Sequence, residues 1–178
     1  MHPAEVEQVL ETMKVCVDTR EQPTKRAEMR YKQFGCPYQR KKLNVGDYTA
    51  VFTMPDGKEL SLENLISIER KESITELCMC FCQERKRFIR EFDRARDSGT
   101  KVYLLIENAS FKNMYAGKYR SHMAPKSLIA SILSWLARYD CQIVFVEPEG
   151  SGRLIRDILF YEARELLLQM EEGDKNEH

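Results

Sequence analysis

The chain has 178 residues, of which 43% are hydrophobic and 31% are charged, and its basic and acidic side chains cancel to a net charge of zero. This composition fits one globular domain, and no apolar run approaches the ~18 residues that a membrane-spanning helix needs. Three glutamates in the first 14 residues do not fit a signal peptide. We therefore expect a cytoplasmic protein, not a membrane protein, whose six cysteines are reduced.

The first half of the chain favours one helix followed by strands. Residues 3–13 have the apolar spacing of a short amphipathic helix, and residues 14–17 form an apolar run that predicts a strand ending at Asp18. Residues 22–39 are polar, basic and aromatic, which favours an exposed helix or loop followed by a turn. A second strand is predicted near residues 46–53.

A turn at residues 55–57 (Pro-Asp-Gly) predicts a hairpin, whose third strand ends at Lys71. The two arms are unequal, because Asp47 lies eight residues before the turn and Glu69 lies twelve after it. If the two carboxylates face each other, about four residues must be absorbed, and residues 61–64 are the expected bulge or break.

The second half alternates helices with strands. The spacing of Leu77, Phe81, Phe88 and Phe92 predicts one long helix over residues 74–96. Further along the chain we expect a central strand at 101–107, a basic loop at 110–126, a helix at 125–139, a buried strand at 141–146, a helix at 153–170 and an acidic tail at 171–178. This order predicts an α/β fold, in which helices cover both faces of a mixed central sheet.

The ends of three predicted strands carry acidic residues. Side chains alternate along a strand, so Glu69 and Lys71 share one face while Arg70 points to the other. Asp47 can supply a second carboxylate, and Asp18 also follows a strand. Two carboxylates and a lysine at one sheet edge can hold a divalent cation and position a water molecule, which suits metal-assisted hydrolysis of a phosphodiester.

These motifs resemble those of the XPF-type nuclease domain, a branch of the PD-(D/E)XK restriction-endonuclease-like superfamily. That family shows a Val-Asp-x-Arg-Glu strand end, then Gly-Asp, then Glu-Arg-Lys followed by x-x-x-Asp. Residues 17–21 (Val-Asp-Thr-Arg-Glu), 46–48 (Gly-Asp-Tyr) and 69–71 (Glu-Arg-Lys) stand here in the same order. The resemblance runs from about residue 14 to residue 168, and it places the nuclease domain at 14–170, after an N-terminal helix at 1–13.

The resemblance implies a metal-dependent DNA endonuclease with a restriction-endonuclease-like fold. By this resemblance Asp18, Asp47 and Glu69 are the acidic residues of a Mg²⁺ or Mn²⁺ site, the carbonyl of Ile68 also faces the metal, and Lys71 is the catalytic lysine. It further implies a preference for branched or flapped DNA near junctions of single and double strands, and a homodimer through the last helix. Short stand-alone versions in bacteria and phages are the relatives that the chain resembles.

The chain departs from the family pattern at the last acid of the motif. Thr75 stands where the family has aspartate, and the neighbouring Glu76 is only a near substitute. This departure keeps a non-catalytic alternative open, in which the chain is a DNA-binding or scaffold subunit of a repair or recombination complex. A resolvase or a restriction-type nuclease is the alternative within the same superfamily.

Basic side chains in three parts of the chain are candidates for contact with DNA. The predicted loop at 110–126 mixes basic and aromatic residues and has no acid, although an ordinary mobile loop has the same composition. Lysines and arginines also follow the Glu-Arg-Lys strand. The candidates are Arg20, Arg70, Arg85, Arg87, Lys118, Tyr119, Arg120 and Lys126.

The cysteines do not predict a zinc site. Cys78, Cys80 and Cys82 stand at alternate positions of a predicted helix, so their directions diverge by about 200° and they cannot close one tetrahedral site. The three histidines show no ligand spacing. We expect small, buried or half-buried thiols.

Overall fold

The computed structural model describes residues 2–176, and the side chains of residues 2–170. Within this range one mixed sheet has the strand order β2-β1-β3-β5-β6-β7, and β4 pairs with β3 outside this path. The strands are β1 (Lys14–Asp18), β2 (Tyr38–Lys41), β3 (Tyr48–Thr53), β4 (Glu59–Ser61), β5 (Ile66–Lys71), β6 (Lys101–Glu107) and β7 (Gln142–Val146). The strand β3 runs antiparallel to β1 and β5, whereas β5, β6 and β7 are parallel to one another.

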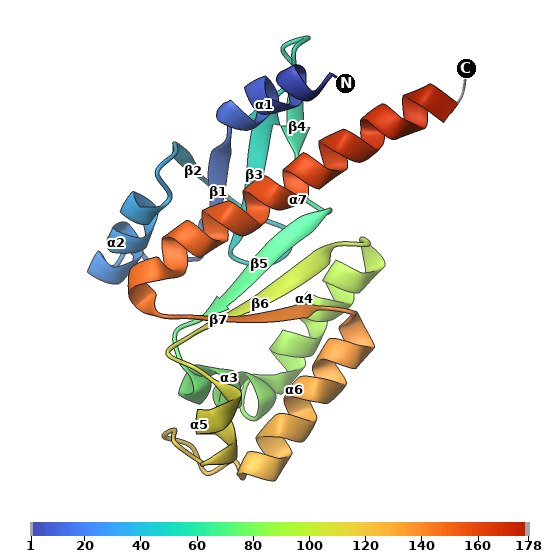
Figure 1. Cartoon of the computed structure of the whole chain (residues 1–178). Coiled ribbons are helices and arrows are strands. Elements are labelled where there is room, and N and C mark those ends of the chain that lie inside the picture. The colour runs from blue at the N-terminus through green and yellow to red at the C-terminus, as the bar shows by residue number, and fades with distance from the viewer. Residues whose placement is uncertain (1, 177–178) are drawn as a thin grey trace.

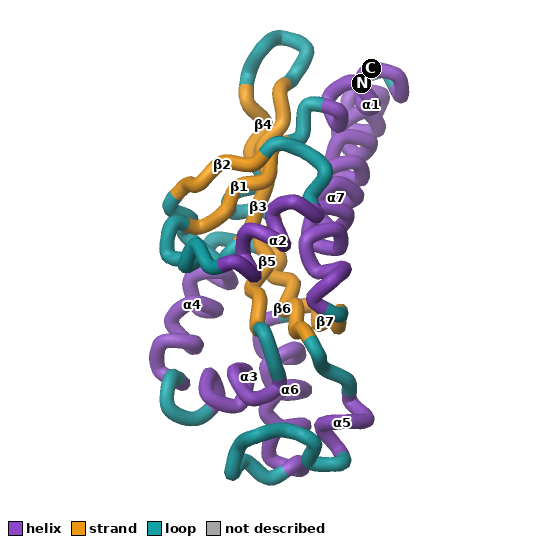
Figure 2. Tube along the Cα trace, turned by 90° about the vertical axis from the view of Figure 1, so that its left-hand side faces the viewer, coloured by secondary structure: helices purple, strands orange, loops and turns teal. Residues whose placement is uncertain are grey.

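Helices cover both faces of this sheet, as the sequence predicts (Figures 1 and 2). They are α1 (Pro3–Glu11), α2 (Lys25–Gln33), α3 (Ile74–Phe81), α4 (Arg85–Asp97), α5 (Phe111–Tyr115), α6 (Pro125–Tyr139) and α7 (Pro148–Asn176). The helix α7 contacts α1 and α2 on one face, and α3, α4 and α6 contact one another on the other. None of the described helices combines the length and the apolar character needed to span a bilayer.

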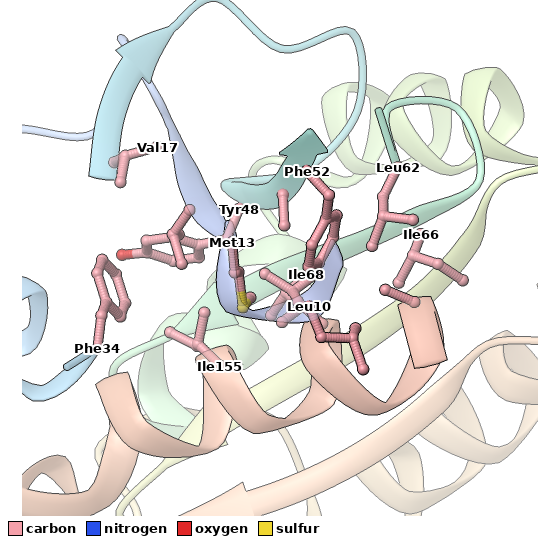
Figure 3. Close-up of a cluster of buried hydrophobic side chains, with 14 of the residues drawn as sticks. Leu10, Met13, Val17, Phe34, Tyr48, Phe52, Leu62, Ile66, Ile68 and Ile155 are labelled. Atoms are coloured by element: carbon pink, nitrogen blue, oxygen red, sulfur yellow. The ribbon is translucent and has the colours of Figure 1, made fainter. Parts of the chain in front are cut away.

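The first hydrophobic core lies between the sheet and the face formed by α1, α2 and α7 (Figure 3). Leu10 and Phe34 contribute from the first two helical segments, Tyr48 and Ile68 from adjacent strands, and Ile155 from α7. Each of these five side chains is at most 3% exposed. The last helix therefore completes a core that otherwise consists mainly of residues from the first half of the chain.

The second core lies on the opposite face and is rich in aromatic rings. Phe88 stacks on Trp135 with ring centroids 4.8 Å apart and an interplanar angle of 11°. Phe81 and Phe92 meet the same indole edge-on, each at 5.4 Å. These contacts join α3, α4 and α6. They show that Phe81, Phe88 and Phe92, which define the apolar spacing in the sequence, are core residues.

The single long helix predicted over residues 74–96 is wrong, because the chain breaks between α3 and α4 at residues 82–84. In one straight helix Phe81 and Phe88 would be separated by about 10 Å along the axis. The break brings their ring centroids to 5.7 Å, so that both rings contact Trp135. No glycine or proline marks this break, and tertiary packing overrides the helical periodicity.

The segment expected as an exposed helix or loop at residues 22–39 contains two elements that the sequence did not resolve. The helix α2 begins after Thr24, whose hydroxyl accepts a hydrogen bond from Ala27 N, and it buries Arg30 and Tyr31. The strand β2 then pairs in parallel with β1. Its sequence Tyr-Gln-Arg-Lys has no apolar alternation, because it is an edge strand of the sheet.

The predicted interruption of the hairpin is confirmed. The strands β3 and β4 pair across the turn, with Val51 opposite Ser61, and β5 begins only at Ile66. Between them Leu62 is buried and Asn64 adopts a left-handed conformation with φ of 66°. The same strand β3 can therefore pair with β4 at one end and with β5 at Tyr48 at the other.

Two predictions for the second half need correction. The basic loop contains the short helix α5, which buries Met114. The strand β7 is half-buried rather than buried, because it lies at the edge of the sheet. In α6 the structure confirms the bounds 125–139.

The last helix begins at Pro148, five residues before the predicted start, and includes Gly150 and Gly152. A Cβ atom on Gly152 would lie 2.1 Å from the carbonyl oxygen of Arg30, so glycine lets α7 approach α2 closely. The helix continues into the predicted acidic tail as far as Asn176. Residues 177–178 of that tail, and the side chains of residues 171–176, lie outside the described part of the chain.

Candidate active site

The candidate site lies where β5 ends, and it has the side-chain alternation that the sequence predicts. Glu69 and Lys71 are buried, and Lys71 Nζ lies 2.6 Å from Glu69 Oε1. Lys71 Nζ also lies 5.5 Å from the ring centroid of Phe88, which belongs to the aromatic core under α4. Arg70 points to the opposite face, where its guanidinium donates a hydrogen bond to Glu107.

Asp47 reaches this strand end through two hydrogen bonds. Its backbone N–H donates to the carbonyl of Ile68 at 2.8 Å, and its Oδ2 accepts from the backbone N–H of Arg70 at 2.8 Å. Together these bonds hold the Asp47 carboxylate beside the Glu69–Lys71 pair. The carbonyl of Ile68, proposed from the family resemblance to face a metal, accepts the bond from Asp47 N.

The residue before Asp47 has to be glycine for steric reasons. Gly46 has a φ of +71°, and a Cβ atom there would lie 2.1 Å from Ser67 Oγ and 2.9 Å from the carbonyl oxygen of Ile68. The Gly-Asp motif therefore brings the loop into direct backbone contact with β5. This close approach is what places Asp47 at the strand end.

We expect Gly46→Ala to destabilise the fold by about 2–4 kcal/mol, since it combines backbone strain with a steric clash. The same change should reduce the function of the site, because Asp47 would move away from β5. Thermal and urea unfolding of the variant measure the first effect. Gly57→Ala is a suitable control, since that glycine also has a positive φ but a Cβ atom there would meet no other atom within 4 Å. Equal losses for the two variants would contradict the steric argument.

The electrostatics of the site come from negative charges held away from water. Loss of hydration, together with the neighbouring charge of Glu69, raises the pKa of Asp47 to about 8. Burial alone would lower the pKa of Lys71, but the carboxylates of Glu69 and Asp47 outweigh it and raise that pKa above its ordinary value. The lysine therefore stays charged, while the two carboxylates repel each other and favour a bound cation.

The structure places Asp18 close to Asp47 but gives its carboxylate several partners. Asp18 N donates to the carbonyl of Asp47, and the Asp18 oxygens accept from the backbone and side chain of Arg20 and from Leu43 N. Burial would raise the pKa of Asp18, but these hydrogen bonds outweigh it and hold the pKa below its usual range. Arg20 continues to Glu91 on α4, with 3.5 Å between NH1 and Oε1.

The position of the missing family acid lies at the start of α3. Glu76 Oε1 lies 3.9 Å from Lys71 Nζ, while its other oxygen accepts a hydrogen bond from Glu72 N. Thr75, which replaces the family aspartate, accepts a hydrogen bond through Oγ1 from Arg120 N. The basic loop after α5 therefore lies against the same helix end that carries Glu76.

A buried network of charges supports the strand end from the opposite face, and sequence reasoning missed its members Arg30 and Glu107. Arg30 NH1 lies 2.6 Å from Glu21 Oε1, and Arg30 Nε lies 3.4 Å from Glu107 Oε1. Glu107 also binds Arg70 at 3.1 Å, and Tyr48 hydrogen-bonds both Glu21 and Arg30. The one signal in the sequence was a glutamate directly after the apolar run of β6.

The candidate DNA-binding side chains lie in different environments. Arg20 and Arg70 take part in the contacts around the site, and Arg87 approaches Glu84 at 4.0 Å. Lys118, Lys126 and Arg85 are exposed, as is Arg120, whereas Tyr119 is half-buried and donates a hydrogen bond to the carbonyl of Met123. Of these, Arg120 lies beside α3 through its backbone bond to Thr75.

The described residues contain no cluster of three or more histidine, cysteine or acidic side chains placed to hold a metal ion. Two carboxylates nevertheless fit Mg²⁺, which proteins commonly bind through one or two carboxylates while water and substrate phosphate complete its octahedron. Asp47 Oδ1 and Glu69 Oε2 accept no hydrogen bond within the described part of the chain, so one oxygen of each is available.

Comparison with known proteins identifies the family and the fold of the chain. The family model of the ERCC4 domain matches residues 17–156. No curated protein sequence matches the chain significantly. Two solved structures of XPF from Aeropyrum pernix, one of them in complex with DNA, are 18% identical in sequence to this chain, each with a TM-score of 0.60. They cover 84% and 85% of this chain, which in turn covers 61% and 65% of theirs.

The chain thus spans less than two thirds of the length of the XPF chains that it matches. At this identity the likeness shows a common fold, which is restriction-endonuclease-like, as the sequence motifs imply. The family match covers most of the chain, including the strand ends that carry Asp18, Asp47, Glu69 and Lys71. The chain belongs to the ERCC4 domain family and shares the fold of the XPF structures.

Proposed function

We propose that this protein is a DNA endonuclease that hydrolyses phosphodiester bonds with the help of Mg²⁺ or Mn²⁺. The observation that carries the proposal is the buried Glu69–Lys71 pair with Asp47 bound beside it at the end of β5. Membership of the ERCC4 domain family and the structural likeness to an XPF in complex with DNA support it.

In this proposal Asp47 and Glu69 hold the metal ion through the two oxygens, Asp47 Oδ1 and Glu69 Oε2, that accept no hydrogen bond from the described residues. A bound divalent ion would polarise the phosphate and lower the pKa of a water ligand. Lys71 is kept charged by the carboxylates and held in place by Glu69 and the Phe88 ring. It would donate a hydrogen bond to the attacking water or to a phosphate oxygen, and so would orient the reactants.

Asp18 and Ile68 have supporting roles in this proposal. The Asp18 carboxylate binds Arg20 and Leu43 N, so it fixes the loop that carries Asp47 rather than presenting free oxygens. The Ile68 carbonyl positions Asp47 through its backbone N–H, and its second lone pair remains for a metal. A metal ligand set of Asp47 and Glu69 alone is the simplest that the contacts allow.

The test of the function is a cleavage assay on labelled duplex, single-stranded, flap and fork DNA with Mg²⁺ or Mn²⁺. We propose that branched or flapped DNA is preferred, and the panel separates this from a resolvase or a restriction-type nuclease. Binding of DNA with no cleavage on any substrate, and no Mn²⁺ binding in calorimetry, would favour a scaffold subunit. A cytoplasmic location stays a prediction from the sequence.

The loop after α5 is proposed to contact DNA next to the site. Reversing the charge of Lys118 and Arg120 together should weaken DNA binding about tenfold or more at moderate salt, because two phosphate contacts become repulsive. Both side chains lie at the surface, so the fold should keep its melting temperature. Fluorescence anisotropy at several salt concentrations measures the effect, and unchanged affinity at low salt would remove this loop from the DNA-binding surface.

We also propose a homodimer. The triple leucine of the last helix does not carry this proposal, because Leu167 is buried in the first core and Leu166 and Leu168 pack against it. Among the described residues no strand pairs with the outer edge of β7, and this edge and the exposed Tyr161 on α7 are the better candidates for an interface. Light scattering that gives only the monomer mass at high concentration would contradict it.

A further inference from the structure

A shallow notch of about 200 Å³ lies between the start of α4 and the outer side of α6, away from Asp47 and Glu69. Its walls combine basic, hydroxyl and small side chains with one indole ring. The lining residues are Arg85, Ala130, Ser131, Ser134, Trp135 and Arg138. None of the proposed catalytic residues lines this notch.

The arginines of the notch carry positive charge, its arginines and serines are hydrogen-bond donors, and none of its lining residues is acidic. Neither Arg85 nor Arg138 lies within 4.0 Å of an acidic side chain in the described part of the chain, although Arg85 donates to the carbonyl of Phe81. Most surface arginines of α4 and α7 have an acidic partner within that distance, namely Arg87, Arg94, Arg96, Arg153, Arg156 and Arg164. Two guanidinium groups that have no acidic partner among the described residues, around one hollow, indicate an anion site.

The notch is continuous with a larger basic surface. Arg85 also borders a second hollow at the start of α4, where Lys86, Arg87 and Arg90 outnumber the one acid, Glu84. Such a surface can bind several anionic groups at once through its guanidinium and hydroxyl groups. It therefore fits anions that repeat along a chain better than an isolated ion. The phosphates of a nucleic acid strand have this chemistry.

Trp135 forms the floor of the notch and links it to the interior. Its ring stacks on Phe88, and the catalytic lysine lies against the same phenyl ring, with Lys71 Nζ 5.5 Å from the Phe88 centroid. Trp135 Nε1 is buried and has no hydrogen-bond partner among the described residues. Because Trp135 is the only tryptophan of the chain, its fluorescence reports on this place alone.

We propose that the notch between α4 and α6 binds a backbone phosphate of the DNA substrate, as a second contact that is separate from the cleavage site. Arg85 and Arg138 clamp the phosphate, and Ser131 and Ser134 donate hydrogen bonds to its oxygens. The inference rests on the proposed function only in taking DNA as the ligand. A free phosphate could use the same donors, so the experiment has to separate the two sources.

The experiment is a titration of the Trp135 fluorescence of the full chain with a 20-nucleotide oligothymidylate, in EDTA so that no cleavage takes place. Thymine emits too weakly to mask the single tryptophan. We expect a saturable change in emission, and a parallel titration with inorganic phosphate should give none below millimolar concentrations. Saturation by phosphate at a similar concentration would instead identify a free-anion site and would overturn the assignment to DNA.

Variants make the assignment specific. Arg138→Glu should weaken oligonucleotide binding at least fivefold and lower the salt dependence by about one phosphate contact. Arg138→Gln, a milder change, should have a smaller effect in the same direction if the first variant is unstable. Arg164→Glu on the exposed side of α7 is the matched control and should leave the affinity unchanged. Equal affinities for the parent and both Arg138 variants would overturn the proposal, and an inactive nuclease would leave this binding result intact.

Discussion

Replacing Glu69 with glutamine is expected to reduce DNA cleavage by about 10³-fold while leaving the fold intact. The change keeps the size of the side chain and removes one negative charge, so it takes away half of the proposed metal-binding pair. A loss of this size is what a charge aimed at the reacting centre contributes. The measurement is the single-turnover cleavage rate on flap DNA at saturating Mn²⁺, together with Mn²⁺ affinity by calorimetry.

Two further variants serve as a control and a comparison for that result. Glu165→Gln makes the same chemical change on α7, where the side chain is 61% exposed, and should leave cleavage unaffected. Lys71→Met should also abolish cleavage but should not weaken Mn²⁺ binding, since it removes a neighbouring positive charge. If Glu69→Gln retained more than a tenth of the parent rate, Glu69 would not be a metal ligand.

Replacing Glu107 with alanine is expected to lower the free energy of unfolding by about 3–5 kcal/mol, because the buried guanidinium groups of Arg30 and Arg70 lose an acidic partner and must share Glu21. Glu107 is 4% exposed and binds both Arg30 and Arg70. For a chain of this length the melting temperature should fall by roughly 2–4 °C per kcal/mol. Urea and thermal unfolding measure both quantities.

The control for this prediction is an ion pair at the surface. Arg164→Ala removes the partner of Glu165, and both side chains are exposed, so the loss should stay within about 1 kcal/mol. A double-mutant cycle with Arg30→Met should show coupling, since Arg30 and Glu107 are in direct contact. A loss below about 1 kcal/mol for Glu107→Ala would mean that the network contributes little to stability.

The sequence predicted how the side chains at the end of β5 are arranged, because the relevant signals are local. Strand alternation alone placed Glu69 and Lys71 on one face and Arg70 on the other, and the structure confirms this. The unequal hairpin arms required an interruption before β5, which the left-handed Asn64 supplies. Gly46 could be identified as a motif residue. The reason why this position requires glycine is its close approach to Ser67, which is a contact across the sheet that the sequence does not show.

What the sequence did not predict depends on contacts between distant segments. Arg30 stands among exposed basic residues in the sequence, and only the acids Glu21 and Glu107 explain why it is buried. The break before α4 has no turn residue, because the indole of Trp135 determines it through Phe81 and Phe88. An edge strand such as β2 carries no apolar pattern, since its side chains face neither core fully.

The position of α7 has a consequence for how the protein folds as it is synthesised. The first core gathers residues from α1 to β5 and is closed by Ile155, Leu159, Ala163 and Leu167 from the far end of the chain. Chain synthesis proceeds at about 5–20 residues per second, so the apolar face of the first strands stays uncovered for several seconds until α7 has been synthesised. Contacts of such long sequence separation also slow the folding transition itself. Until α7 leaves the ribosome, the nascent chain exposes a sheet face that is prone to aggregation or to binding a chaperone, whereas the core around Trp135 is already complete.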